Sequence, residues 1–294
     1  MARGLAAAAG LVLGLSLSIA ILHARETGYP APPETERLLY LRSGRTADRL
    51  MLTFDAIAAD LYWIRAIQHY GRDVMAERRG RRRADSFGLL QPLLDLTTTL
   101  DPHFSIAYRF GSIFLAMQPP EGPGRPDQAI ALLEKGLRAT PDRWQYAYDL
   151  GWVHYWHTGD FTAAADWFDR AADMPRAPAW IRPFAAITRA QGGHRAEARA
   201  ALATLLDSSE VYIRNAAERA LLQLKALDGI DELEAIVAQV RAQTGRLPSS
   251  LAEIFGSAVA DDTGTPFAYD PETGEVSLGP GSPLAPLPKT MGAR

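Results

Sequence analysis

The stretch GDFTAAADWFDRAADMP, residues 159–175, places small and large side chains at fixed intervals. A glycine is followed five residues later by an alanine, and four residues after that by a large apolar residue. The fourth member comes three residues later and is an alanine in this stretch. Three segments share this spacing: Gly124, Ala129, Leu133 and Gly136; Gly159, Ala164, Phe168 and Ala171; and Gly193, Ala198, Leu202 and Leu205. The three alanines are separated by 35 and then by 34 residues. The sequence therefore indicates a chain built from repeated units.

Each motif follows a segment with helical apolar spacing, namely FSIAYRFGSIFLAM, WQYAYDLGWVHYW and WIRPFAAITRAQ. A period near 34 residues with this small–large–small spacing resembles the tetratricopeptide repeat, a helix-turn-helix unit. The resemblance covers roughly residues 53–206 and implies an all-α fold, an α-solenoid that binds other proteins. One unit cannot bury its apolar face alone, so neighbouring units must stack. The second unit has one extra residue between Gly151 and Gly159, which leaves the phase of its first helix open.

The flanks of the repeats extend the helical array. Residues 53–102 resemble a weaker, fourth unit that precedes the three motifs. In residues 207–245, the segments SSEVYIRNAAERALLQLKAL and DELEAIVAQVRAQTG predict two capping helices. In the tail, residues 246–294, RLPSSLAEIF predicts a short helix, and FAYD and EVSL around the turn PETG predict a small β-hairpin. We expect the last dozen residues, which are rich in proline, to be extended or disordered.

The N-terminal segment, residues 1–25, predicts an export signal. Arg3 precedes an uncharged, apolar run over residues 4–22 that is long enough to span a bilayer as a helix. The positive charge before the run favours a cytoplasmic N-terminus with the bulk of the chain on the periplasmic, extracytoplasmic side. We favour an uncleaved signal anchor, although Ser18-Ile19-Ala20 also fits a signal-peptide cleavage site. Prolines in residues 26–52 indicate an extended tether between the anchor and the repeats.

The composition excludes several kinds of site. The chain of 294 residues contains no cysteine, which excludes disulfides, a thiolate nucleophile and Cys-ligated metals. Its net charge of −3 gives no reason to expect a nucleic-acid partner. No phosphate-binding loop and no nucleophile elbow occurs, and His154 with His157 is better explained as a polar helix surface than as a metal site. We therefore expect no catalytic residues, no metal, no cofactor and no enzyme activity.

An arginine cluster is the sharpest charged feature of the sequence. It lies in the segment RRGRRR and comprises Arg78, Arg79, Arg81, Arg82 and Arg83. Such a cluster is able to contact an anionic surface, and after export the available surfaces are anionic lipid, glycan or an acidic protein. The alternative, which we favour slightly, is a solvated loop between two helices.

The strongest candidate binding surface is aromatic. In the resembled family the first helices of the repeats line a concave groove that holds peptides or partner helices. The residues that we expect to line such a groove are Tyr108, Tyr148, Trp152, Tyr155, Trp156 and Trp180. Tyrosine and tryptophan provide a large contact area at low entropic cost, which suits a recognition surface. The alternative is that several of these rings belong to the core.

The sequence therefore predicts a non-enzymatic scaffold, exported and anchored at the membrane. Its groove is expected to bind a peptide or helix of another envelope protein, in secretion, pilus or membrane-complex assembly. An alternative is an envelope carbohydrate-binding protein or glycan-acting enzyme that uses the aromatic cluster, which requires two facing carboxylates beside it. A further alternative is a structural subunit of a large membrane complex. The oligomeric state is not predicted.

Overall fold

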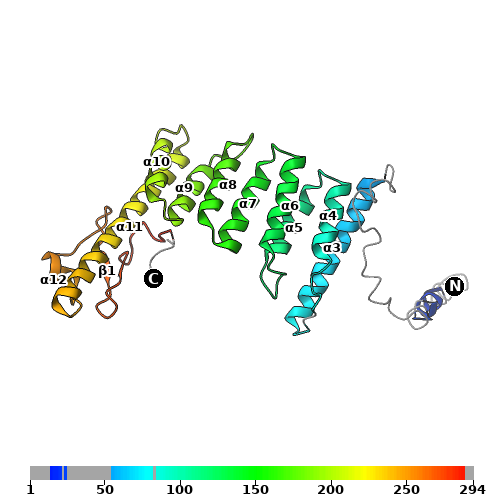
Figure 1. Ribbon diagram of the computed structural model, residues 1–294, viewed down its shortest axis with the longest axis horizontal. Helices are drawn as coiled ribbons and strands as arrows, with labels where there is room; N and C mark the ends of the chain where they lie inside the picture. The colour runs from blue at the N-terminus through cyan, green and yellow to red at the C-terminus, as the bar shows by residue number, and fades with distance from the viewer. Residues whose placement is uncertain (1–13, 22, 25–53, 82–83, 289–294) are drawn as a thin grey trace, which may run out of the picture.

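The computed structural model describes residues 14–21, 23–24, 54–81 and 84–288. Its helices stack side by side into an elongated array (Figure 1). The helices of the array are α3 (Asp55–Arg78), α4 (Leu90–Leu100), α5 (Ser105–Ala116), α6 (Pro126–Ala139), α7 (Trp144–Val153), α8 (Phe161–Asp173), α9 (Ile181–Gln191) and α10 (Arg195–Leu205). Consecutive helices pair as α3 with α4, α5 with α6, α7 with α8, and α9 with α10. This arrangement is the repeated helix-turn-helix unit that the spacing of the motifs predicts.

The helices form two rows. The first helices of the pairs are α3, α5, α7 and α9, and the second helices are α4, α6, α8 and α10. Each second helix also contacts the first helix of the next pair, so that α6 packs on α7 and α8 packs on α9. Direct contacts join the first helices as well: α5 packs on α7, and Phe114 of α5 stacks on Tyr70 of α3 with ring centroids 4.1 Å apart. The buried side chains form successive hydrophobic clusters along the array, one over α3 to α7, the next over α7 to α9, and another that begins on α9 and α10.

The motif residues occupy this core. The three alanines of the motif and the large residues Leu133, Phe168 and Leu202 are all fully buried. Among the described glycines that lie in helices, Gly151 of α7 has the tightest surroundings, because an added Cβ would come within 2.4 Å of the Phe168 ring on α8. Only a glycine fits at this position without displacing the ring, since real Cβ contacts are longer. Gly151 of the preceding helix and the large motif residue Phe168 therefore set the distance between α7 and α8.

The extra residue of the second unit is accommodated in the helix itself. After Val153 the α-helix continues as a π-helical turn, η2 (His154–Thr158), and ends at Gly159 with a left-handed φ of 69°. A π-helix closes i→i+5 hydrogen bonds and so absorbs one residue more than an α-helical turn. Asp160 then caps α8 by accepting a hydrogen bond from the Ala163 amide at 2.9 Å. The phase that the sequence leaves open is therefore set by this turn.

The prediction of two capping helices is wrong. Residues 211–244 form one continuous helix, α11 (Val211–Thr244), which passes through Asp228 and Gly229. Asp228 accepts a hydrogen bond from Arg195 of α10 at 3.0 Å, and Ile230, two positions further on, is already buried against the tail. No proline interrupts the segment, so the backbone is able to continue as one helix. The contacts before and after Gly229 then stabilise that continuous helix.

The tail packs against α11. It contains α12 (Leu251–Phe255) and an antiparallel pair, β1 (Ala268–Tyr269) with β2 (Val276–Ser277), which confirms the predicted short helix and hairpin. In the described part of the proline-rich end, residues 283–288 form no helix or strand, as expected for an extended segment, but they are packed and not disordered. Leu284 is buried, and the Gln223 amide of α11 donates hydrogen bonds to the carbonyls of Leu284 and Pro286 at 2.7 and 2.9 Å. Residues 289–294 lie outside the described part of the chain.

Most of the predicted membrane anchor lies outside the described residues. Residues 14–21 and 23–24 are helical. Among the described residues, no helix combines the length and the apolar character that crossing a membrane requires. Residues 1–13, 22 and 25, together with the tether up to residue 53, are not described, so the anchor stays a prediction.

Substituting Gly151 tests whether close helix approach holds the array together. We expect Gly151→Ala to lower the free energy of unfolding by about 1–3 kcal/mol, because the added methyl group displaces the buried Phe168 ring. The matched control is Gly71→Ala in α3, where an added Cβ meets no atom within 4 Å. There the higher helix propensity of alanine should stabilise the protein by up to about 1 kcal/mol. Urea unfolding followed by circular dichroism measures the free energy of unfolding of both variants. Equal effects of the two substitutions would contradict the role of Gly151 in close helix approach.

Candidate interaction surface

A continuous aromatic cluster joins two repeat units. Its members are Trp144, Tyr148, Trp152, Tyr155, Trp156, Phe161, Phe168, Trp180 and Phe184, each of which has a ring contact with another member. The cluster links α7 and its π-helical turn with α8 and α9. The sequence identifies most of these residues, but it does not show that rings from α7 and α9 touch.

Two ring pairs connect the first helices α7 and α9 across the unit boundary. Tyr148 of α7 meets Trp180, at the N-terminus of α9, edge to face with ring centroids 5.5 Å apart. Trp152 of α7 lies 5.4 Å from Phe184 of α9. Burial raises the pKa of the Tyr148 hydroxyl, which keeps the side chain neutral well beyond physiological pH. Part of the cluster is therefore structural, since these pairs attach one unit to the next.

The exposed edge of the cluster lies on the π-helical turn. Trp156 is 68% exposed and stacks on Trp152 with ring centroids 6.0 Å apart and an interplanar angle of 4°. Trp180 is 39% exposed. Tyr155 is half-buried and its hydroxyl accepts a hydrogen bond from Gln191 of α9 at 3.2 Å. Trp156 and Trp180 are thus the predicted groove residues with the largest accessible surface.

The structure corrects the placement of Tyr108. This side chain is fully buried between α5 and its neighbours, with its ring centroid 5.3 Å from that of Tyr146. Its hydroxyl donates a hydrogen bond to the Thr98 carbonyl at 3.3 Å, and burial raises its pKa to about 12. Tyr108 therefore follows the alternative that several of the rings belong to the core, and Thr98 of α4 provides the acceptor that a buried tyrosine hydroxyl needs. Tyr108 therefore supports the array and does not present a surface to a partner.

Two exposed apolar stripes were missed by the sequence analysis. We call them the first-helix stripes: Ile57, Leu61 and Ile64 on α3, and Ile106, Phe110 and Ile113 on α5. Their side chains are between 47% and 58% exposed. Residues spaced by three or four lie on one helix face, and each stripe lies opposite the buried face of its own helix. The signal was present in the sequence as a second apolar face on helices whose first face is already used in the core.

An ion pair lies between the stripe on α5 and the aromatic cluster on α7. The Arg109 guanidinium donates two hydrogen bonds to the Asp149 carboxylate, Nε to Oδ2 at 2.6 Å and Nη2 to Oδ1 at 3.1 Å. Burial raises the pKa of the Asp149 carboxyl, and the guanidinium acts against that increase. A bidentate pair of this kind fixes the relative position of two helices. It therefore holds the two apolar surfaces in register.

The arginine cluster lies at the other end of α3. Arg78 is the last residue of that helix, and Arg79 and Arg81 follow in an exposed turn. The Arg78 guanidinium approaches Glu121 at 3.6 Å. Arg82 and Arg83 lie outside the described residues, so contact of this cluster with an anionic surface stays a prediction.

The two histidines of the predicted polar surface lie on the π-helical turn. Burial lowers the pKa of both His154 and His157, which favours the neutral form of each imidazole. Within the part of the chain that the structure describes, no group of three or more His, Cys, Asp or Glu side chains is placed to hold a metal ion.

Comparison with known families matches the centre of the array. Residues 123–179 match the family model described as tetratricopeptide repeat. The match begins just before α6 and ends just before α9, so it includes the motif from which the period was read. Comparison with curated proteins and with solved structures finds no significant match to either.

The division of the cluster into structural and exposed rings predicts different effects of truncation. Trp152→Ala removes a ring packed against Tyr148, Phe168 and Phe184, and we expect it to lower the free energy of unfolding by about 2–4 kcal/mol. Trp156→Ala removes an exposed ring and should change the free energy of unfolding by less than about 1 kcal/mol. Thermal unfolding followed by circular dichroism compares the two variants. Equal destabilisation would show that the two rings do not differ in structural role.

Proposed function

We propose that this chain, whose residues 123–179 match the tetratricopeptide repeat model, is a non-enzymatic scaffold whose first-helix face binds an apolar segment of another envelope protein. The first-helix face consists of the first-helix stripes on α3 and α5 together with Trp156 and Trp180. Arrays of such repeats form extended binding surfaces, which supports a protein partner. The family match is to interaction modules that generally lack catalysis.

The observation that carries this proposal is the exposure of large apolar side chains on α3 and α5, of Trp156 on the π-helical turn and of Trp180 at the start of α9. Single exposed apolar residues are ordinary, whereas contiguous patches mark interaction sites. Here the apolar residues occupy the face of α3 and α5 that the second helices leave uncovered. Arg109 of α5 is paired with Asp149 of α7, and Trp156, on the turn that follows α7, has a side chain type that is enriched in binding hot spots.

The chemistry of the face fits a partner segment with an apolar side of its own. Isoleucine, leucine and phenylalanine offer no hydrogen bonds, so affinity must come from burying apolar surface. An amphipathic helix provides such a surface with the same three- and four-residue spacing as the stripes. The charged Arg109–Asp149 pair in the middle of the face then provides a polar contact that fixes the register of the partner.

The envelope location is part of the same proposal and rests on the sequence. The apolar run over residues 4–22, with Arg3 before it, supports export and anchoring by residues 1–25. Partners in secretion, pilus or membrane-complex assembly fit a scaffold held at the membrane. The arginine cluster offers a second contact, to anionic lipid, in a scaffold held near the bilayer.

Site-specific photo-crosslinking tests the first-helix face. A photoreactive residue is placed at Phe110 on α5 or at Trp156 on the π-helical turn, and crosslinked partners in native membranes are identified by mass spectrometry. We expect the same partner protein at both positions. Matched controls place the residue at Ala131 on α6 and at Arg170 on α8, which are exposed on second helices. A partner captured equally at all four positions, or only at the controls, would overturn the proposal.

Export is tested separately, with the full chain and with a chain that lacks residues 1–25. We expect the full chain to remain in the membrane fraction after an alkaline wash, because an apolar anchor is retained where peripheral contacts are released. In intact spheroplasts, added protease should digest the repeats of the full chain and spare those of the truncated chain. Protection of the full chain until the cells are lysed would place the repeats in the cytoplasm and refute export.

A further inference from the structure

The exposed apolar face of α3 is longer than its share of the first-helix stripes. α3 forms the end of the array farthest from α11 (Figure 1). The spacing of three and four residues that joins Ile57, Leu61 and Ile64 begins at Phe54, before the helix, and reaches Met75 near its C-terminus. Large apolar side chains in contiguous patches mark interaction sites. We call this surface the α3 face; its apolar side chains are between 40% and 63% exposed, and they are Phe54, Ile57, Leu61, Ile64, Ile67 and Met75.

Arginines follow one edge of the α3 face. Arg65, Arg72 and Arg79 are spaced by seven residues, so they lie in line along the helix. Arg72 and Arg79 are exposed, and Arg65 is half-buried with its guanidinium 5.7 Å from the centroid of the Tyr62 ring. An arginine beside an apolar surface is able to keep its charged end in a polar layer while its stem lies on that surface. An apolar face with a basic edge is typical of helices that lie in a membrane interface.

The exposed charge around the α3 face is mainly positive. Asp60 is the one exposed acidic residue of α3, whose whole length the structure describes. Arg78, Arg79 and Arg81 are exposed where the helix ends, in addition to Arg72. A second copy of the same face would bring these positive charges together, which opposes association. An anionic surface instead gains from each arginine that comes close to it.

We propose that α3 lies on the surface of an anionic bilayer, with its apolar face at the boundary of the acyl chains and its arginines on lipid phosphates. A bilayer surface offers hydrocarbon to the apolar side chains and phosphate oxygens to the guanidinium groups. The inference rests on the membrane anchoring in the proposed function, since residues 1–25 would hold this end of the array near the bilayer. It assigns the α3 end of the first-helix face to lipid, and it leaves the stripe on α5, Trp156 and Trp180 to the partner protein.

A fluorescent probe on the full chain tests this contact. Because the chain contains no cysteine, Leu61→Cys provides a single site for an environment-sensitive fluorophore. The labelled chain is reconstituted into vesicles of phosphatidylcholine, alone or mixed with phosphatidylglycerol, and the vesicles are isolated by flotation. Quenching by lipids that carry a nitroxide on the acyl chain then reports contact of the probe with the bilayer. We expect quenching at least about threefold stronger in the anionic vesicles than in the zwitterionic ones.

Matched probe positions define the surface that meets the lipid. Phe110→Cys lies on the stripe of α5, and Ala131→Cys is exposed on the second helix α6. Both probes should stay in water in both kinds of vesicle. Equal quenching at Leu61→Cys and at either of these positions would overturn the proposal. So would a probe at Leu61→Cys that stays in water in anionic vesicles, a result that leaves the α3 face to the partner protein.

Charge removal tests the basic edge. In the Leu61→Cys chain, Arg72→Gln with Arg79→Gln should lower the ratio of bilayer-bound to free α3 at least about tenfold, because each arginine near an anionic surface favours contact. The matched control, Arg138→Gln with Arg170→Gln, removes the same charge from exposed positions on α6 and α8 and should leave quenching unchanged. If the first variant loses helicity by circular dichroism, Arg79→Gln alone decides, because Arg79 is an exposed residue after the last turn of α3. Equal quenching in the edge variant and its control would overturn the proposal.

These results separate the α3 face from the proposed function. The vesicles contain no other protein, so quenching at Leu61→Cys does not depend on the partner that crosslinking at Phe110 and Trp156 is designed to find. A full chain that fails to float with zwitterionic vesicles would refute the anchor of residues 1–25. Flotation and quenching in anionic vesicles would then still support contact of α3 with lipid, and their absence would overturn it.

Discussion

The close approach of Gly151 to the Phe168 ring is the constraint on which the array depends. A helix pair gains stability by burying large rings, yet rings keep helices apart unless the facing residue is small. The chain solves this by placing glycine or alanine opposite a large residue in each unit, as Gly136 does against Tyr108 and Tyr146. The distance within a pair then fixes where the next pair stacks. Ring contacts such as Tyr148 with Trp180 exist because this spacing is maintained.

The same constraint explains why an extra residue changes the surface and not the core. Gly151 and Phe168 have to stay in contact, so the additional residue of α7 can only be absorbed after Val153. The π-helical turn provides this space and turns Trp156 outward while Trp152 stays packed. π-Helical turns inside helices are often found at functional positions. Here the turn separates the rings that hold two units together from the ring that is accessible to a partner.

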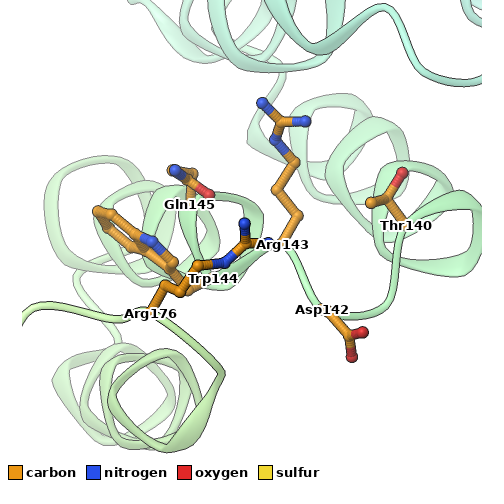
Figure 2. Close-up of a pocket in the computed structure, with 6 residues that line it drawn as sticks. All are labelled: Thr140, Asp142, Arg143, Trp144, Gln145 and Arg176. Carbon is orange, nitrogen blue, oxygen red and sulfur yellow. The ribbon is translucent and has the colours of Figure 1, made fainter.

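The sequence predicts the parts of this structure that repeat and misses those that depend on contacts between units. The alanines at a fixed period predicted the helix pairs, and PETG between FAYD and EVSL predicted the hairpin. The continuity of α11 was missed because Asp228-Gly229 looks like a break until Arg195 and the tail are in place. Tyr108 was assigned to the surface because its backbone acceptor belongs to another helix. The first-helix stripes were visible as apolar spacing, whereas the pocket between the α6–α7 turn and the α8–α9 turn (Figure 2) depends on stacking of the units.

The docking of the tail on α11 gives the array two different ends. A solenoid gains its stability from contacts between neighbours, so an end unit has only one neighbour to hold it. At the α11 end, Gln223 and the buried Leu284 tie the chain's last described residues to the outermost helix. At the α3 end, the exposed Phe54 and Ile57 have no such cover among the described residues. Local opening should therefore be most frequent at the α3 end, and amide hydrogen exchange should slow progressively from α3 toward the centre of the array.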